Sequence, residues 1–508
     1  MEQNKTKSRK HLWAYIVFGV IYFFSVSIAV IVAWSRREFD VDLKQLIYTV
    51  AAPLVGTDSG VLENALKGCL PPIVFFMLLG GAAVWGVTRI NKEARFSIKL
   101  KSQALNFNTR EMAKKGLALL SCLVFAGSLA YTEASYGVFN YIKMQSNKTK
   151  IYDEYYVNPL SVDITAENGK GKNLIYIYME SMENTYCQVD LGAGERVNLI
   201  PELTSLAEKN ISFSNSTGLG GYHPFTGATW TMGSLFSSSA GIPFSFPVEQ
   251  NSMGQYATFA AGTVALGDIL EQKGYVQEFL CGSDASYAGR RSFYEQHGNY
   301  EIFDVYTARE RGYIPEDYFT WWGFEDKYLY EIAKDEITRL AAGDKPFNLT
   351  MLTVDTHFPE GYTCSLCGDA YIEAAANVVS CADRQLSEFI SWCQAQDFYK
   401  DTVIVIVGDH PRMDLVLVNG TEYYTRTLYN CIIGSAAAAP QNIKNREFTA
   451  MDMFPTVLSS MGFKIEGERL GLGTNMLSGR RTLLEELGRE YLTDELMKNS
   501  DYYLNNFN

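Results

Sequence analysis

The sequence predicts an α/β domain with a mainly parallel central sheet flanked by helices, preceded by transmembrane helices. One observation is a set of long uncharged apolar runs, all within the first 138 residues. Another is a set of short apolar runs further along the chain, typical of strands buried on both faces. The clearest, TVIVIV, is followed by Gly408, Asp409 and His410. A carboxylate and an imidazole placed after a central strand lie where open α/β sheets bind ligands.

Three apolar runs predict a membrane anchor within residues 1–138. Their bounds are about 12–34, 69–87 and 117–138, and the first contains 23 residues without a formal charge. Each run is long enough to cross the hydrocarbon core of a bilayer. Charged residues follow the first run where a cleavage site would stand, so we interpret it as an uncleaved anchor. A shorter run, residues 43–55, is expected to lie at the membrane interface or to re-enter.

The distribution of Lys and Arg predicts the orientation of the chain. The N-terminal tail and residues 88–116 are rich in both, which places them in the cytoplasm. Three crossings then predict a multi-pass protein of the cell membrane whose large domain is extracytoplasmic. If residues 43–55 also crossed, the outcome would be inverted. The remaining segments are expected to be a polar connector (139–172), the large domain (173–480) and a peripheral tail (481–508).

Composition restricts the partners and the cysteine chemistry. The net charge of −13 argues against nucleic acid as a partner. The 32 Tyr and 29 Phe suit glycan stacking and membrane interfaces, although most are expected in the core. Seven of the nine Cys follow residue 172, so at least one of them stays unpaired or bonds to another chain.

Three predicted strands end in residues that can bind a metal or a substrate. The run NLIYIYME ends in Glu180, FNLTMLTVD is followed by His357, and TVIVIV precedes Asp409 and His410. A single charged strand end has ordinary explanations, such as a surface turn or an acid at a helix N-terminus. Three such ends converge on one sheet edge and describe a site. Their oxygen and nitrogen donors suit a divalent metal.

A Gly-, Ser- and Thr-rich segment, residues 218–243, predicts a loop leading into a helix that begins near Thr231. A hydroxyl at this position commonly caps the helix. The alternative is a nucleophile, because the amide groups and dipole of a helix start favour a phosphoryl anion and an alkoxide. Thr226, Thr229 and Ser234 are neighbouring hydroxyls, and the spacing leaves the choice among them open.

The other predicted elements complete the large domain. A further strand, residues 276–280, is followed by Arg290 and Arg291, which suit a phosphate or carboxylate or are solvated surface charges. Helices are expected over residues 203–210, 258–274, 371–396 and 451–463.

The cysteines near the predicted helix 371–396 leave several possibilities open. A disulfide between Cys367 and Cys381 is one pairing, and Cys364 is the rival partner. A zinc site built on Cys364 and Cys367 would need two further ligands close by. An oxidising location disfavours that zinc site.

The ordered motifs NLIYIYMES, GATWTMGSLFSSSAGIPF, GSDASYAGR, LTVDTHFPEGY and VIVIVGDH resemble those of phosphoglycerol transferases that decorate periplasmic glucans. They resemble the lipoteichoic acid synthases more distantly. Both groups belong to the alkaline phosphatase/sulfatase superfamily, and the resemblance covers about residues 173–465. The sulfatase hallmark, Cys or Ser followed by x-Pro-x-Arg, is absent, since TMGSL stands at Thr231. This departure disfavours a formylglycine sulfatase.

The resemblance implies a role for each motif residue. Glu180, Asp409 and His410 match metal ligands, together with the oxygen of Thr231, which matches the nucleophilic threonine. His357 matches the histidine that contacts the phosphoglycerol head group, and this residue would orient the acceptor or shuttle its proton. The ligand set suits Mn²⁺ or Mg²⁺, with Zn²⁺ as an alternative.

The head-group pocket and the anchor depart in part from the family pattern. Arg290 matches an arginine of the pocket. Ala288 stands where the synthases carry an aromatic residue, which leaves the head-group contacts at this position open. The anchor has three predicted spans where the synthases have five.

The implied activity is transfer of glycerophosphate from a phosphatidylglycerol-like lipid to a glycan or polymer acceptor through a phospho-threonine. One alternative is a phosphoethanolamine transferase or a phosphodiesterase on the same fold. Another, from a different class, is a non-catalytic receptor for lipid head groups or surface glycan, which would show no metal-dependent turnover.

Overall fold

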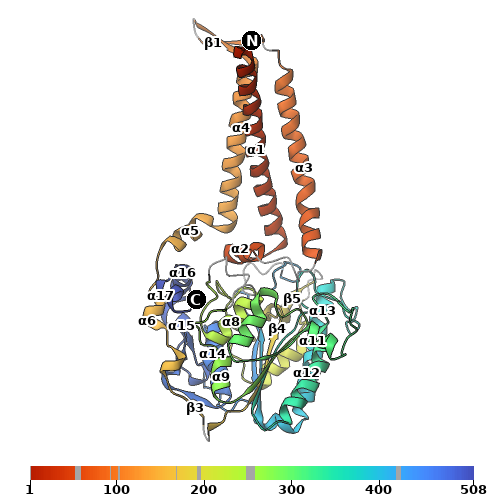
Figure 1. Cartoon of the computed structure of the whole chain (residues 1–508), viewed down its shortest axis with the longest axis vertical. Coiled ribbons are helices and arrows are strands. Elements are labelled where there is room, and N and C mark those ends of the chain that lie inside the picture. Colours follow the sequence, from red (N-terminus) through yellow and green to blue (C-terminus); the bar gives the residue numbers. More distant parts are fainter. Residues whose placement is uncertain are drawn as a thin grey trace. The chain divides into compact units, whose positions relative to one another are not determined.

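The computed structural model describes residues 2–51, 59–91, 93–100, 103–166, 169–191, 196–246, 258–418 and 425–507 (Figure 1). The chain forms two compact units, and each is described by itself. The first comprises Met1–Phe39 and Ser59–Tyr141, and the second comprises Asp40–Asp58 and Ile142–Asn508.

The first unit is built on three long helices, α1 (Glu2–Glu38), α3 (Ser59–Arg89) and α4 (Thr109–Tyr136). Each is long and apolar enough to cross a membrane. The segments that meet this criterion are Tyr15–Glu38, Glu63–Arg89 and Thr109–Tyr136, which contain or overlap the three apolar runs of the sequence. A hairpin of β1 (Arg95–Leu100) and β2 (Gln103–Asn108), which the sequence did not predict, connects α3 to α4.

The short apolar run after the first span forms α2 (Leu43–Ala51), a helix of nine residues. At about 1.5 Å per residue it is roughly half as long as the hydrocarbon core is thick. It belongs to the second unit, where the Nζ atom of Lys44 donates a hydrogen bond to Ser245 Oγ at 2.7 Å. A helix of this length is too short to span a bilayer, and residues 52–55 of the run lie outside the described residues.

The second unit is organised around a six-stranded sheet in the order β11-β10-β4-β9-β7-β8. Five strands are parallel, and only the edge strand β11 runs antiparallel to its neighbour. The strand bounds are β4 (Asn173–Met179), β7 (Val276–Cys281), β8 (Glu301–Phe303), β9 (Phe347–Leu352), β10 (Thr402–Gly408) and β11 (Asn430–Ile433). The sequence predicted β4, β7, β9 and β10, whereas β8 and β11 are too short to give a clear pattern.

The sheet is buried on both faces, which explains the uninterrupted apolar runs. In β4, Leu174, Tyr176 and Tyr178 enter one hydrophobic cluster, while Ile175 and Ile177 enter another on the opposite face. Helices cover both faces (Figure 1). Residues of α8 (Thr231–Ala240), α9 (Leu266–Gln272) and α14 (Met453–Ser460) contribute to the first cluster. Residues of α7 (Pro201–Lys209), α11 (Val305–Glu310), α12 (Asp326–Ala341) and α13 (Ala374–Gln394) contribute to the second.

Smaller elements complete the two units. Among them, β12 (Phe463–Ile465) pairs with β3 (Ile164–Ala166). The others are α5 (Val138–Ser146), α6 (Ile151–Tyr155), β5 (Val189–Asp190), β6 (Arg196–Val197), α10 (Arg290–Gln296), β13 (Arg469–Leu470), β14 (Gly473–Thr474), α15 (Leu483–Leu487), α16 (Arg489–Met497) and α17 (Asp501–Asn506).

Two segments contribute to the core, although the sequence predicted a polar connector and a peripheral tail for them. The expected connector contributes the buried Ile151 and Tyr152, and the C-terminal tail forms helices instead of a loose end. The rings of Tyr503 and Phe507 from the tail pack against Tyr152, with centroids 5.3 and 5.9 Å away. Because the tail is charged and rich in Asn, its composition gave no indication that these few aromatic residues pack into the core.

The helix predicted over residues 258–274 is also shorter than expected. The described residues before Leu266 form turns, and α9 begins only at that position. The carboxylate of Asp268 accepts a hydrogen bond from the backbone N–H of Ala265 at 2.8 Å, which satisfies a donor at the helix start.

Candidate functional site

Two neighbouring strands bring the predicted metal ligands together. Strands β4 and β10 are adjacent and parallel, with Met179 opposite Gly408, so Glu180 and Asp409 emerge side by side at the same sheet edge. A side chain at Gly408 would not fit, because its Cβ would lie 1.7 Å from the carbonyl oxygen of Met182. Glycine therefore allows the backbone before Asp409 to pass close to the chain that follows Glu180.

Glu180, Asp409 and His410 form a compact cluster at this edge. One ligand atom from each lies within 4.8 Å of the others, and all three residues are buried. Thr231, the first residue of α8, joins this cluster. Its Oγ1 atom lies 3.3 Å from Glu180 Oε2 and 3.2 Å from His410 Nε2. Of the four hydroxyls that the sequence left open, Thr231 is the one that hydrogen-bonds to this cluster.

Each ligand side chain uses one atom for support and leaves another facing the cluster. Asp409 Oδ1 accepts hydrogen bonds from the backbone N–H groups of Ser181 and His410, both at 2.7 Å. Asp409 Oδ2 is buried without a hydrogen-bond partner among the described residues. Glu180 Oε1 accepts a hydrogen bond from Ser181 Oγ at 2.7 Å, while Oε2 faces Thr231.

The ring of His410 is oriented in the same manner. Its Nδ1 lies 2.9 Å from the carbonyl oxygen of Pro411, which can only accept, so Nδ1 carries the proton. The lone pair of Nε2 then faces Thr231 and the two carboxylates. Metal-binding histidines commonly have one nitrogen donating to a carbonyl and the other coordinating.

The electrostatics of the cluster favour a bound cation. Burial and the nearby Glu180 carboxylate raise the pKa of Asp409 to about 7. Burial also acts to raise the pKa of Glu180, but the attraction of His410 and His357 outweighs it and the pKa falls below its usual value. Two buried carboxylates with a free oxygen and an imidazole lone pair fit a divalent ion of the oxygen- and nitrogen-binding kind.

His357 lies beside this cluster, in the loop after β9. It interacts electrostatically with Glu180 and His410, and burial lowers its pKa. Its Nδ1 lies 2.7 Å from the carbonyl oxygen of Phe358, so this nitrogen carries the proton and Nε2 keeps its lone pair. His357 is therefore a neutral imidazole able to accept a proton.

Arg290, at the start of α10, is buried and held by the loop that precedes it. Its guanidinium donates hydrogen bonds to Ser283 Oγ at 3.1 Å and to the carbonyl oxygen of Asp284 at 2.7 Å. A row of rings joins it to His357. Arg290 lies 5.7 Å from the centre of the Tyr287 ring, and Tyr287 and Trp322 are 5.6 Å apart. Trp322 and His357 are 4.6 Å apart.

Several supporting residues were not identified from the sequence. Thr353 Oγ1 accepts a hydrogen bond from the Glu180 backbone N–H at 2.9 Å, and Thr356 Oγ1 donates one to the Glu180 carbonyl at 2.5 Å. Ser181 has a φ of +53°, an uncommon conformation for a non-glycine residue. This conformation is found where the Ser181 N–H reaches Asp409. Hydroxyl residues next to a charged strand end are common, so no sequence signal distinguishes these.

The predicted disulfide between Cys367 and Cys381 is not formed in the structure. All nine cysteines are free thiols. Cys364 lies close to both, with its Sγ atom 3.7 Å from that of Cys367 and 3.9 Å from that of Cys381. The sequence could rank these pairings only by spacing, whereas the fold brings all three thiols together.

The fold and the cluster define an α/β domain with a candidate divalent-metal site at the carboxyl edge of its sheet. Residues 172–463 match the family model described as Sulfatase. Because the match covers more than half of the 508 residues, the chain belongs to the sulfatase family.

Curated relatives share part of this chain. Phosphoglycerol transferase I of Salmonella choleraesuis is 31% identical over 376 residues, which cover 72% of this chain and 46% of that protein. Phosphoglycerol transferase I of Xanthomonas euvesicatoria pv. vesicatoria is 31% identical over 317 residues, which cover 61% of this chain and 43% of that protein. The chain thus spans less than half the length of these relatives.

A solved membrane protein shares the fold. It is the integral membrane protein lipooligosaccharide phosphoethanolamine transferase A from Neisseria meningitidis. The two are 14% identical with a TM-score of 0.50, over 92% of this chain and 87% of that chain. This similarity confirms the predicted fold class, an α/β domain with N-terminal helices that could span a membrane.

Proposed function

We propose that this chain is a membrane-anchored, metal-dependent phosphotransferase that moves glycerophosphate from a phosphatidylglycerol-like lipid to a cell-surface glycan or polymer. The observation that carries the proposal is the position of the Thr231 hydroxyl, 3.3 Å from Glu180 and 3.2 Å from His410. A hydroxyl at a helix N-terminus beside a candidate metal site is the arrangement that phosphoryl transfer needs. Two relatives named phosphoglycerol transferase I support the choice of substrate.

The first half-reaction is a substitution at phosphorus. The Thr231 oxygen forms a bond to the phosphorus of the lipid phosphodiester, and the bond from phosphorus to the diacylglycerol oxygen breaks. The Thr231 proton is lost and the leaving oxygen gains one, so diacylglycerol departs and glycerophosphate stays on Thr231. The α8 dipole stabilises the negative charge that gathers on the phosphoryl oxygens.

In the second half-reaction a hydroxyl of the glycan or polymer attacks phosphorus and releases Thr231. His357 is the base we assign to this step, because its Nε2 lone pair is available and it lies beside Glu180. Arg290 contributes a permanent positive charge to the head-group pocket, and the intervening Tyr287 and Trp322 rings provide its wall.

Glu180, Asp409 and His410 would hold the divalent ion, for which Mn²⁺ is our first choice and Mg²⁺ or Zn²⁺ the alternatives. When bound, this ion supplies Lewis acidity that lowers the pKa of a coordinated hydroxyl and offsets phosphoryl charge. The chain's own contribution is orientation, since Ser181 and the Pro411 carbonyl fix the free oxygen of Asp409 and Nε2 of His410.

The anchor places the enzyme where its donor is. The three candidate spans of the first unit would hold it in the cell membrane, and the Lys and Arg distribution would place the catalytic domain outside. The lipid donor would then lie in the same membrane as the anchor.

A phosphoethanolamine transferase is the second candidate, favoured by the fold shared with a protein of that name. Labelled phosphatidylglycerol and phosphatidylethanolamine, each supplied with and without a glycan acceptor, separate the two activities. Turnover without an acceptor would instead identify a phosphodiesterase, and no metal-dependent turnover of either lipid would favour a receptor.

The direct test is the Thr231→Ala substitution in the full chain. We expect diacylglycerol release to fall by about 10³-fold or more, because the nucleophile is lost. The matched control is Thr229→Ala, since the Thr229 hydroxyl is buried nearby without a hydrogen-bond partner among the described residues. Mass spectrometry of the wild type after exposure to phosphatidylglycerol should locate a glycerophosphate adduct on Thr231. Full lipid turnover by Thr231→Ala would refute the assignment.

A further inference from the structure

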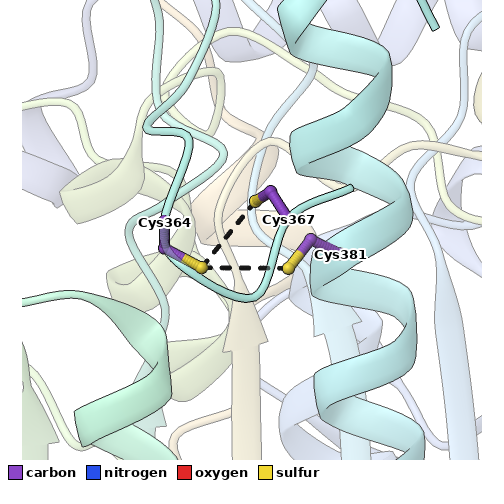
Figure 2. Close-up of side chains that lie close together, drawn as sticks. All are labelled: Cys364, Cys367 and Cys381. Carbon is purple, nitrogen blue, oxygen red and sulfur yellow. Dashed lines mark hydrogen bonds between the residues drawn. The ribbon is translucent and has the colours of Figure 1, made fainter. Parts of the chain in front are cut away.

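A second cluster of potential metal ligands lies outside the site described above. Cys364 and Cys367 belong to the loop that connects β9 to α13, and Cys381 lies on α13 itself. Figure 2 shows the three side chains directed toward one another, with dashed lines joining the Cys364 sulfur to those of Cys367 and Cys381. Cys364 and Cys381 are buried, and Cys367 is half-buried. The proposed phosphotransfer does not use any of these residues.

The distances between the sulfur atoms match those of a metal site. Cys364 Sγ lies 3.7 Å from Cys367 Sγ and 3.9 Å from Cys381 Sγ, and all three lie within 4.8 Å of one another. Zinc–sulfur bonds of about 2.3 Å in a tetrahedron place sulfur atoms about 3.8 Å apart. A disulfide requires a separation of about 2.0 Å. The observed triangle is therefore large enough to surround an ion.

Hydrogen-bond donors support the sulfur atoms from outside the triangle. The backbone N–H of Leu366 donates to Cys364 Sγ at 3.4 Å, and Gln385 Nε2 donates to Cys381 Sγ at 3.3 Å. The turn is tightened by a hydrogen bond from the Cys367 N–H to the Cys364 carbonyl at 3.1 Å. Donors of this kind stabilise thiolates and orient them as ligands.

Two cations hold the turn that carries the first two cysteines. Arg384 of α13 donates to the carbonyl oxygen of Leu366 at 3.2 Å, and Lys327 of α12 donates to Ser365 Oγ at 3.2 Å. Three thiolates and a divalent ion carry a net charge of −1. Lys327 is also paired with Glu325 at 3.1 Å, so Arg384 is the cation that offsets this charge.

We propose that Cys364, Cys367 and Cys381 bind a zinc ion, with water in the fourth position of the tetrahedron. Of the two further ligands that the sequence analysis required, the structure supplies one, Cys381, and no fourth His, Cys, Asp or Glu joins the group within the described part of the chain. The three cysteines are free thiols, which keeps them available as ligands despite the oxidising location expected from the sequence. The half-buried Cys367 marks the side on which water can enter. This site is separate from the Glu180 cluster in its residues and in the softness of its ligands.

The ion would fasten the β9–α13 loop to α13. That loop begins just after β9 and carries His357, so its position sets where the imidazole stands relative to Glu180. Loss of the ion would loosen the loop without removing any residue of the Glu180 cluster. The expected consequence for catalysis is a higher KM with a smaller change in kcat.

The test uses the full chain in detergent, purified without chelator or reductant. The protein carries the Asp409→Asn substitution, which prevents metal binding at the Glu180 cluster. Its zinc content is measured by inductively coupled plasma mass spectrometry. We expect about one zinc ion per chain, and exchange for Co²⁺ should give a thiolate-to-cobalt charge-transfer band. This band is diagnostic, because the Glu180 cluster contains no sulfur.

Matched variants identify the ligands. Cys381→Ser and Cys367→Ser should each abolish the band, whereas Cys393→Ser, which removes another buried thiol from α13, should retain it. Because Cys367 is half-buried, its variant remains informative if Cys381→Ser fails to fold. A protein without zinc and without the band would overturn the proposal, as would a disulfide among the three found in non-reduced peptides. The Thr231→Ala variant should also retain the cobalt band. The zinc proposal can therefore be tested independently of the proposed phosphotransfer activity.

Discussion

The described residues contain two clusters of three potential metal ligands, and these clusters differ in their ligand atoms and in their support. The Glu180 cluster offers oxygen and nitrogen atoms at the ends of two adjacent strands, β4 and β10. The cysteine cluster offers sulfur atoms from a loop and from the helix α13. The first is next to the Thr231 hydroxyl, whereas the second contacts hydrogen-bond donors from its own loop and helix.

This difference separates a site suited to chemistry from one suited to holding structure. Strand ends are rigid and fixed by the sheet, so an oxygen- and nitrogen-ligated ion there can face a substrate with constant geometry. Thiolates bind zinc strongly, and a zinc ion bound in this way connects segments that few apolar contacts would otherwise hold together. The variants that follow test whether the two clusters act independently, starting with the largest expected effect.

The largest effect is expected from Asp409→Asn. The Oδ2 atom of Asp409 faces the cluster without a hydrogen-bond partner among the described residues. A neutral amide at this position would weaken metal binding, because it removes one of the negative charges that offset the charge of the ion. We expect diacylglycerol release to fall by about 10³-fold or more. Turnover measured with labelled phosphatidylglycerol checks this, and the cobalt band of the cysteine cluster serves as the control. Loss of that band would show that the two clusters are coupled.

The next effect concerns the head-group pocket. Arg290→Lys keeps the charge but loses the guanidinium, which donates from Nη2 to Ser283 and Asp284 and from Nε to the Tyr287 carbonyl. We therefore expect KM for the lipid to rise by about tenfold or more. The matched control is Arg291→Lys, which changes a partly exposed neighbour paired with Asp304. Steady-state kinetics on both variants distinguishes KM from kcat. An equal effect from the two substitutions would contradict the role assigned to Arg290.

A third effect concerns stability. Removing the proposed zinc ion by Cys381→Ser should lower the free energy of unfolding by about 2–4 kcal/mol, since metal binding contributes directly to folding. Chelator should lower the Tm of the wild type toward that of the variant, with no further change in the variant. Thermal unfolding followed by circular dichroism gives both values. An equal response of the wild type and Cys381→Ser to chelator would assign the stabilisation to another metal.

Much of the sheet and of the Glu180 cluster could be predicted from the sequence. Strands buried on both faces are nearly continuous apolar runs, and the charged residues that end them stand out against such runs. Glu180 and Asp409 follow strands that proved to be neighbours. Adjacent parallel strands place their carboxyl ends together, so the strand ends alone indicated the cluster.

The cysteine cluster and the C-terminal helices could not be predicted in the same manner. The contact between Cys364 and Cys381 joins a loop to a helix, and neither periodicity nor spacing determines how a loop folds back. The tail is anchored by few apolar residues such as Tyr503 and Phe507, whose partner Tyr152 lies some 350 positions earlier in the sequence. Contacts between distant segments of irregular structure are decided by tertiary packing.

A third group of buried acids differs from both clusters, because arginine side chains compensate its negative charge. Glu278 on β7 is buried and paired with Arg339, which also contacts Glu336 and Glu301, and Arg311 bonds to the same two glutamates. Burial and the charge of Glu336 raise the pKa of Glu278 to about 8. Arginine supplies here the positive charge that the Glu180 cluster lacks, so this group is structural and needs no ion.

The smallest effect is therefore expected from Glu278→Gln, and it should depend on pH. The pKa of Glu278 in the folded protein is raised above its usual value of 4.5. Between about pH 4.5 and 8 the unfolded chain therefore releases a proton that the folded protein keeps. Wild-type stability thus falls as the pH rises through this window. We expect the variant to gain on the order of 1–2 kcal/mol relative to the wild type between pH 5 and pH 8. Denaturant unfolding at both pH values measures this, with the exposed Glu331→Gln as the control, and added Mn²⁺ or Zn²⁺ should leave the difference unchanged.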